Sequence, residues 1–267
     1  MKKLKNWLVC LLLAVCCISF VACGSDKNNV NLNQKPNVVI EGDFQQTEVA
    51  QLSTTFGTKE AVVVENFARY QVYMSLSMKD YTQTTNMAFE LDEEGKLQGM
   101  AMKMSLPMDE LSNVDATCYY KNSMFYISMR MGRYSYNYKF DPTKIIVGEN
   151  ADVDFSQYTN VLDEMNIAAM LDRFYSAMEN NEYFEFSKTE DNTKFKVQTK
   201  ADAKLPAELE YTSLTMEIEL FEGKLSQMRC VVTGDTNIEI LLTKTDKKIK
   251  YPNFDDFMDI TDMMGTN

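Results

Sequence analysis

The residue types that usually carry out acid–base or nucleophilic chemistry are sparse in this chain. Its 267 residues include no histidine, which removes the commonest general base near neutral pH, the commonest transition-metal ligand and every Ser–His or Cys–His pair. The Ser-x-x-Lys motif of serine–lysine acylating enzymes is also absent, and the ten glycines are scattered singly rather than grouped into a phosphate loop. We therefore expect a protein that is not an enzyme and that holds no cofactor.

Carboxylates are abundant, but they cluster in segments that look like turns. A pair of carboxylates can cleave glycosides, and a regularly spaced set can bind Ca²⁺, yet no EF-hand loop is present. A solvated acidic surface accounts for the groups better, so we expect no metal site. The formal charge of −12 also argues against a nucleic-acid partner, which requires a basic surface. The groups are Asp92-Glu93-Glu94, Glu190-Asp191 and Asp255-Asp256-Asp259-Asp262.

The first 22 residues have the pattern of an export signal. Lys2, Lys3 and Lys5 precede an apolar run from Leu8 to Val21, and Phe20-Val21-Ala22-Cys23 follows. This ending resembles a bacterial lipobox, in which the cysteine receives diacylglycerol and palmitate chains and becomes the first mature residue. The resemblance implies a signal peptide over 1–22, lipidation of Cys23 and a place on the extracytoplasmic face of the cell membrane. The alternative is an uncleaved membrane anchor.

Residues 23–56 are rich in Asn, Gln, Ser and Thr and show no hydrophobic period, which predicts a polar, largely disordered tether. Loss of the three signal-peptide lysines moves the formal charge from −12 to −15. Because an anionic membrane repels such a chain, we expect the body to stand away from the bilayer on its tether. Cys118 and Cys230 remain in the body, and the sequence leaves open whether they form a disulfide or stay buried thiols.

The body is organised around a hairpin pattern that occurs twice. Alternating apolar residues over 82–91 and 96–106, joined by a turn at Gly95, predict a β-hairpin. The segment 213–233 repeats it around Gly223, and eight of thirteen aligned positions are identical when Glu93 is counted as one extra loop residue. Further strands are expected at 117–121, 124–131, 134–140, 183–188, 194–199, 237–243 and 247–251.

Two helices are expected between these groups of strands. The segment 160–180 has an apolar stripe at helical spacing. The segment 58–79 fits both a helix and a strand, and its length without Gly or Pro favours the helix. The sequence therefore predicts an α+β fold with two related helix-plus-meander halves, 57–150 and 151–267, which share one curved antiparallel sheet with helices packed on its concave face.

This layout resembles the half-barrel lipoproteins of the LolA/LppX type. The similarity covers residues 57–260 and rests on the lipobox, the tether and the hairpins with Glu-Gly-Lys-Leu turns. It implies a strongly curved sheet with helices against its concave side, and a role in carrying lipids or lipoproteins. No binding residue of that group can be placed on this sequence.

Methionine is over-represented, with 19 residues in the chain. Methionine suits surfaces that accept varied apolar partners, although it also fills ordinary cores. We therefore consider two functions. One is binding of a lipid or another amphiphile on an apolar concave surface, and the other is binding of an envelope protein partner by a sensor or interaction module. The residues expected on the ligand face are Met87, Phe89, Met100, Met102, Met104, Leu171, Phe174 and Met228.

Overall fold

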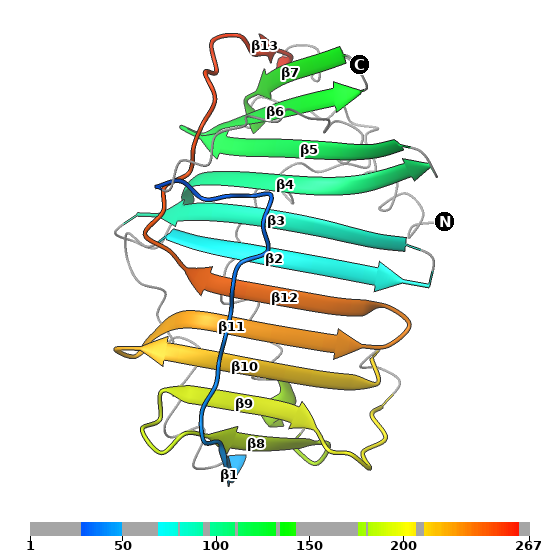
Figure 1. Cartoon of the computed structure of the whole chain (residues 1–267), viewed down its shortest axis with the longest axis vertical. Helices are drawn as coiled ribbons and strands as arrows, with labels where there is room; N and C mark the ends of the chain where they lie inside the picture. Colours follow the sequence, from blue (N-terminus) through cyan, green and yellow to red (C-terminus); the bar gives the residue numbers. More distant parts are fainter. Residues whose placement is uncertain are drawn as a thin grey trace, which may run out of the picture.

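The chain forms one large curved sheet, seen in a computed structural model that describes residues 28–49, 69–79, 81–92, 97–109, 112–131, 134–142, 176–179, 181–206 and 211–261. Within these ranges all thirteen strands belong to the same sheet (Figure 1). In sheet order they are β1 (Gln45–Thr47), β8 (Phe184–Lys188), β9 (Lys194–Thr199), β10 (Ser213–Phe221), β11 (Lys224–Thr233), β12 (Asn237–Lys244), β2 (Arg69–Met78), β3 (Tyr81–Leu91), β4 (Leu97–Asp109), β5 (Ser112–Lys121), β6 (Met124–Met131), β7 (Tyr134–Phe140) and β13 (Met258–Asp259).

The two predicted copies of the hairpin are present as β3–β4 and β10–β11. In both, the register shifts next to the turn, between Glu90 and Leu91 in one hairpin and between Glu219 and Leu220 in the other. These positions are equivalent in the sequence repeat, so the two hairpins share a β-bulge as well as an alternating pattern. At the β10–β11 turn Glu222 and Gly223 both have positive φ, of 52° and 77°, which fits the right-handed twist of the flanking strands.

The second half of the chain joins the first half through β12 and β2. These strands pair antiparallel over the whole of β12, from Asn237 opposite Ser77 to Lys244 opposite Tyr70. Consecutive hairpins therefore run outward from this junction on both sides, to β7 in one direction and to β8 in the other. Of the neighbouring pairs of strands, β7 and β13 are parallel and the others are antiparallel.

The predicted α+β class, with helices packed on the concave face, is wrong. Among the described residues no helix reaches seven residues, and the fold is nearly all sheet. Residues 69–78, expected to belong to a helix, form β2 near the centre of the sheet. The alternation of a strand is present in the sequence at Tyr70, Val72 and Met74, but the length of 58–79 without Gly or Pro was given more weight. Gln71, on the opposite face of β2 from Tyr70 and Val72, is buried as they are. Of the helix expected over 160–180, the described part is one turn, 176–179.

One face of the sheet is apolar and carries the main core. Residues directly opposite each other in the register project from the same face, and one such row crosses ten strands from Phe195 to Tyr138. Its members between those ends are Ile218, Met228, Leu242, Val72, Met87, Met102, Cys118 and Ile127. We call this side the apolar face. The turn at 176–179 contributes Ala177, 1% exposed, to its largest cluster.

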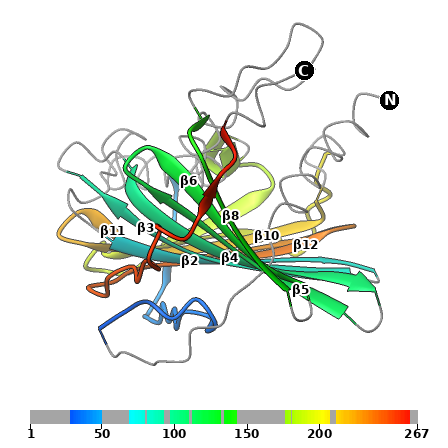
Figure 2. The same cartoon turned by 90° about the horizontal axis from the view of Figure 1, so that it is seen from above.

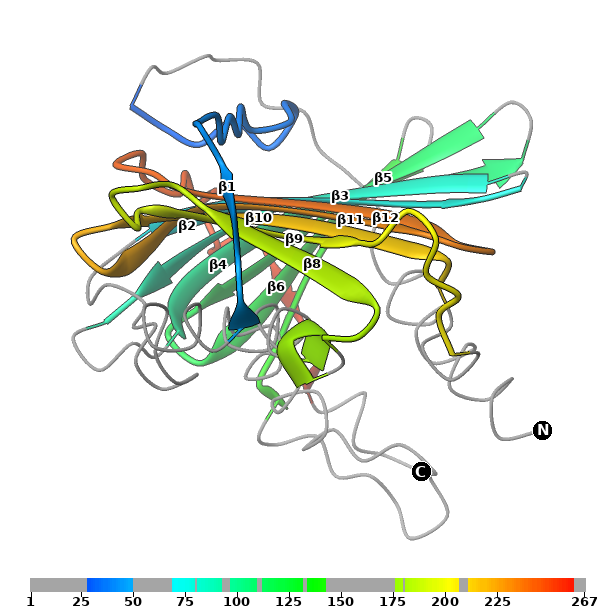
Figure 3. The same ribbon diagram turned by 90° about the horizontal axis from the view of Figure 1, so that it is seen from below.

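The opposite face is more polar and is crossed by residues 28–44, which we call the N-terminal strap. Figure 1 shows the strap in blue running across the strands to β1, and Figure 3 shows it on the opposite side of the sheet from the turn at 176–179. Polar contacts hold it: the Gln71 side-chain amide donates to the carbonyl oxygens of Asn31 and Gln34, and Lys103 Nζ donates to Asn33 Oδ1 at 2.7 Å. The prediction of a free tether therefore does not hold for residues 28–49, which are packed on the sheet.

The C-terminal segment, residues 245–257, lies on the same polar face before it reaches β13. Ile249 packs there with Ala88 and Ala101, and Val30 of the strap packs beside them. Further along, the ring of Phe254 stacks on Tyr126, with 3.7 Å between centroids. Figure 1 shows the segment, in orange and red, running past the ends of β2, β3 and β4 to β13, and Figure 2 shows the same segment from above. The strap and the C-terminal segment thus cover Ala88 and Ala101, which would otherwise be exposed apolar residues on the polar face.

Candidate functional site

The residues predicted for the ligand face lie on the apolar face where the structure describes them. Met87 and Met102 are directly opposite each other, and Met228 is in the same row three strands from Met87. Phe89 and Met100 pair in an adjacent row, and Met104 follows on β4. Leu171 and Phe174 lie outside the described residues.

These side chains differ in how completely they are buried. Met228 is 0% exposed and Met87 and Met100 are 3% and 4% exposed, whereas Phe89, Met102 and Met104 are only partly buried. Met228 belongs to the main cluster, which fills the apolar face over β8–β12, β2 and β3. Met102 contacts this cluster and also a smaller one around Ala116, Cys118, Ile127 and Phe140. The apolar face is therefore closely packed over the second half, and its less enclosed part begins at Met102 and Met104.

A row of partly buried methionines marks that part of the face. The register places Met74, Met104 and Met129 in one row across β2, β4 and β6, with Thr85 and Ala116 between them. Each of the three methionines keeps intermediate exposure. Flexible thioether side chains on one continuous surface can adapt to apolar groups of different shape. We call these three methionines, together with Met102 of the adjacent row, the methionine row.

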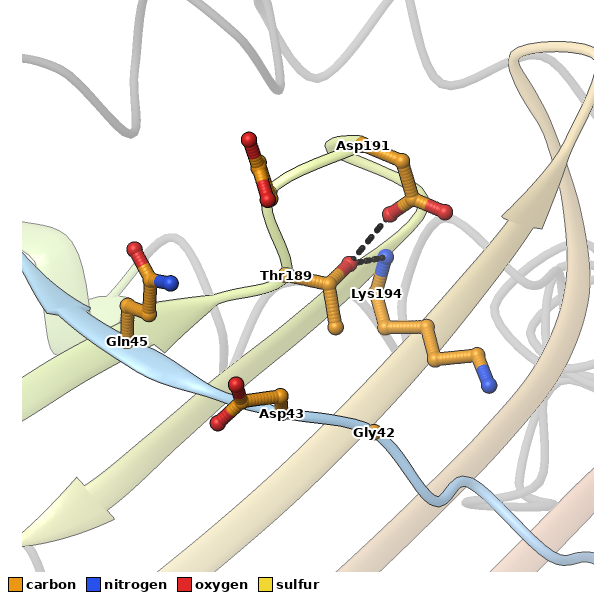
Figure 4. Close-up of a pocket in the computed structure, with 7 residues that line it drawn as sticks. Gly42, Asp43, Gln45, Thr189, Asp191 and Lys194 are labelled. Carbon is orange, nitrogen blue, oxygen red and sulfur yellow. Dashed lines mark hydrogen bonds between the residues drawn. The ribbon is translucent and has the colours of Figure 1, made fainter.

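A hollow of different chemistry lies where β1 meets the β8–β9 turn (Figure 4). It has a volume of about 470 Å³ and is lined by Gly42, Asp43, Gln45, Thr189, Glu190, Asp191 and Lys194. Strap residues line one side and turn residues the other. Gly42 is required for this approach, because a Cβ atom there would lie 2.8 Å from Thr189 Cγ2.

Three of the polar residues that line this hollow, Thr189, Asp191 and Lys194, already have partners in the protein. Asp191 Oδ1 accepts hydrogen bonds from the Thr189 hydroxyl at 2.6 Å, the Thr193 hydroxyl at 2.9 Å and the Thr193 N–H at 3.2 Å. These donors, the Thr189 hydroxyl foremost, lower the pKa of the Asp191 carboxyl. Lys194 Nζ donates to the Glu41 carbonyl and lies 3.5 Å from Glu219 Oε1. No group of three or more acidic or cysteine side chains in the described part of the chain could hold a metal ion.

The two cysteines of the body are free thiols in separate parts of the apolar face. Cys118 is on β5 and Cys230 is on β11, and both are buried. Five strand spacings separate β5 from β11 in the sheet, or about 24 Å at about 4.8 Å each. A disulfide needs Cα atoms within about 7 Å of each other. Cys118 and Cys230 are therefore two buried thiols and do not form a disulfide. Burial raises the pKa of the Cys118 thiol from 9.0 to about 12.

The sequence did not reveal the groups that tie the two covering segments to the sheet. Gln71 and Lys103 hold the strap, and Lys121 Nζ lies 4.2 Å from the ring centroid of Tyr251 in the C-terminal segment. Each belongs to a strand on which it looks like an ordinary outward-facing polar residue. One feature of the sequence could have indicated a covering segment. Ala88 lies opposite Ala101, and two small residues paired on a polar face leave room for another segment.

The described residues contain no helix that is both long and apolar enough to span a membrane. No protein-family model and no curated protein matches the chain. Among solved structures, the chain is similar to LprF from Mycobacterium bovis, at 11% identity and a TM-score of 0.39, over 77% of this chain and 97% of that one. The likeness is one of overall layout.

Proposed function

We propose that this protein is a lipoprotein of the cell envelope that binds a hydrophobic or amphiphilic molecule, such as a lipid, against the methionine row. The observation that carries the proposal is the unequal burial of a continuous apolar face. At the centre of the second half the face is closely packed, with Met216 and Met228 each 0% exposed. At the methionine row, the same face keeps partly exposed, adaptable side chains.

The proposed attachment to the membrane comes from the N-terminal sequence. A lysine-bearing start, an apolar run and Ala22-Cys23 favour cleavage before Cys23 and acylation of its thiol. Two or more acyl chains give stable anchoring. The proposed role is binding without catalysis, in keeping with the absence of histidine from the sequence.

Native mass spectrometry of the purified mature protein tests for a ligand directly. The expected result is a co-purifying lipid, together with saturable binding of a fluorescent fatty acid. Met104→Glu places a charge on the face and should weaken probe binding at least about ten-fold, because burying an unpaired carboxylate is costly. Absence of both the co-purifying lipid and probe binding would overturn the ligand proposal.

Met258→Glu is the matched control. It makes the same substitution at a methionine that is 61% exposed on β13, so probe affinity should stay unchanged. Equal loss in both variants would mean that charge alone, rather than the methionine row, determines binding. The anchor is tested separately with Cys23→Ala, which should release the protein from the membrane fraction.

A second candidate is binding of an envelope protein along β7 and β13. Tyr134, Tyr136 and Met258 are 69%, 38% and 61% exposed there, and among the described residues β13 pairs with Tyr138 and Lys139 of β7. Exposed aromatic residues on a strand with few partners suit addition of a strand from another chain. Cross-linking from position 134 in cells would identify such a partner, and adding Tyr136→Ala to the same protein should lower the yield of the cross-linked complex.

A further inference from the structure

The first described residues of the strap are held against the C-terminal segment. Asn29 and Lys248 form a parallel bridge, in which the Val30 N–H donates to the Lys248 carbonyl at 3.0 Å and the Lys248 N–H donates to the Asn28 carbonyl at 3.1 Å. Val30 and Ile249 add apolar contact beside this bridge. The chain is therefore fixed to the body of the protein from Asn28 onward.

Only four residues separate Asn28 from Cys23. A chain spans at most about 3.6 Å per residue, so the Cα atoms of Cys23 and Asn28 are within about 18 Å of each other in any conformation. If Cys23 is acylated, as the proposed function holds, the bridge at Lys248 must stay within about that distance of the membrane surface. The body then cannot stand far from the bilayer on a long tether.

Lysines gather at the same place. Lys247, Lys248 and Lys250 are exposed, and Ile249 between them is buried under the strap. We call these three lysines the basic corner. None of them forms an ion pair with a carboxylate of the described residues, unlike Lys35, Lys194 and Lys196. One acidic residue, Asp246, lies in this stretch of the segment and is exposed.

We infer that the basic corner binds the anionic phospholipid headgroups of the membrane that holds the anchor, and so orients the sheet on it. This inference rests on the acylated Cys23 of the proposed function and is independent of any bound ligand. Without the three lysines of the signal peptide, the formal charge of −12 becomes −15, so most of the surface is repelled by an anionic bilayer. A local group of lysines beside the attachment point is attracted instead. Repulsion of the rest of the body reinforces the same orientation.

Energy transfer from the protein to labelled lipid headgroups measures this orientation. The lipidated full mature protein is reconstituted into phosphatidylcholine vesicles, or into vesicles that also contain phosphatidylglycerol. One dye is attached at Asp246→Cys, beside the basic corner, and in a second preparation at Asp235→Cys. Asp235 is exposed in the turn at the opposite end of β12, and the native thiols are buried.

In anionic vesicles we expect more transfer from position 246 than from position 235. Replacing Lys247, Lys248 and Lys250 with Gln should reduce the difference, as should high salt, because each lysine favours the docked orientation by roughly five-fold. Equal transfer from the two positions, or transfer that the triple variant and salt leave unchanged, would overturn the inference.

Flotation with neutral vesicles reports on the anchor alone. The triple variant should float as the wild-type protein does, since its acyl chains are intact. A wild-type protein that does not float would overturn the acyl anchor and this inference together. A protein that floats but shows no preferred orientation would overturn the inference and leave the anchor standing.

Discussion

The hydroxyl of Tyr70 ties the two halves of the sheet together. Tyr70 is on β2 and is 0% exposed, and its hydroxyl donates to the carbonyl of Leu225 on β11 at 3.2 Å, across the intervening β12. Its ring stacks on Phe89, with 5.7 Å between centroids. A buried polar group of this kind contributes to stability because its partner would otherwise lose a hydrogen bond away from water.

Tyr70→Phe should therefore lower the free energy of unfolding by about 1–2 kcal/mol, since the ring stays and only the buried hydrogen bond is lost. Urea denaturation followed by circular dichroism measures this change. Tyr136→Phe is the control, because Tyr136 is 38% exposed on β7. A loss as large in the control would argue against a specific role of the Tyr70 hydroxyl.

Because the thiol of Cys118 is buried, the free energy of unfolding should decrease as the pH rises into the alkaline range. Desolvation raises the pKa of this thiol from 9.0 to about 12 in the folded protein. Between these values the unfolded chain releases the proton and the folded chain keeps it, so stability that is fully present below pH 9 is lost as the pH rises toward 12. Burial raises the pKa of the adjacent Tyr119 hydroxyl to about 12 as well, which adds to the same trend.

We expect Cys118→Ala to make this alkaline loss of stability shallower. Comparing the variant with wild type at pH 7 measures the packing cost of the substitution, and comparing the slopes from pH 9 to 12 isolates the titration. In native protein the thiol should also react slowly with disulfide reagents, because the thiolate is the reactive form. Parallel slopes for the two proteins would contradict the assigned cause.

At the scale of elements, one glycine sets how closely the C-terminal segment approaches the sheet. A Cβ atom at Gly99 would lie 2.1 Å from the Tyr251 hydroxyl and 3.2 Å from Glu90 Oε2. Tyr251 donates to Glu90 Oε2 at 3.5 Å, and Arg69 Nε donates to Glu90 Oε1 at 2.8 Å. Gly99 thus leaves room for a polar group that links β2, β3 and the segment.

Gly99→Ala should destabilise the protein by about 1–3 kcal/mol, because the added methyl group forces Tyr251 out of its position. Thermal unfolding measures the loss. In a Tyr251→Phe background the closest clash disappears, so Gly99→Ala should cost less there. If Gly99→Ala destabilises both proteins equally, the clash with the Tyr251 hydroxyl is not the cause of the destabilisation.

The same elements show what the sequence could and could not predict. Both hairpins were predictable because their turn residues and their period of two agree, and because each copy supports the other. The helix predicted over 58–79 was wrong for residues 69–78, because the length of the segment without Gly or Pro was given more weight than the alternation of Tyr70, Val72 and Met74. The strap could not be predicted, since its attachment uses polar side chains and backbone groups that leave no hydrophobic period.

The candidate site was predictable to a similar extent. Alternation correctly placed Met100, Met102 and Met104 on one face, because successive side chains of a strand point to opposite sides. Their unequal burial depends on which strands and segments lie nearby, and this is a property of the assembled sheet. The position of the basic corner beside the start of the strap could not be predicted either, since nothing in the sequence indicates that Asn29 pairs with Lys248.

For the whole molecule, the junction of β12 and β2 decides whether the halves behave as separate units. The strands pair at eight positions, and the main core joins Tyr70, Val72 and Met87 of the first half to Met228 and Leu242 of the second. Separating the halves would expose two long strand edges and divide that core. The hairpin repeat therefore builds one continuous sheet, which we expect to unfold as a unit.

Tryptophan reporters test this cooperativity, since the one native tryptophan, Trp7, lies in the predicted signal peptide. Tyr136→Trp reports on β7 and Phe221→Trp on the end of β10, and both wild-type side chains are exposed, so each substitution should cost little. In the mature protein the two fluorescence transitions and the circular dichroism transition should coincide in urea, because loss of the β12–β2 junction removes core from both halves. Midpoints that differ between the reporters would instead indicate that one half unfolds while the other retains its part of the apolar face.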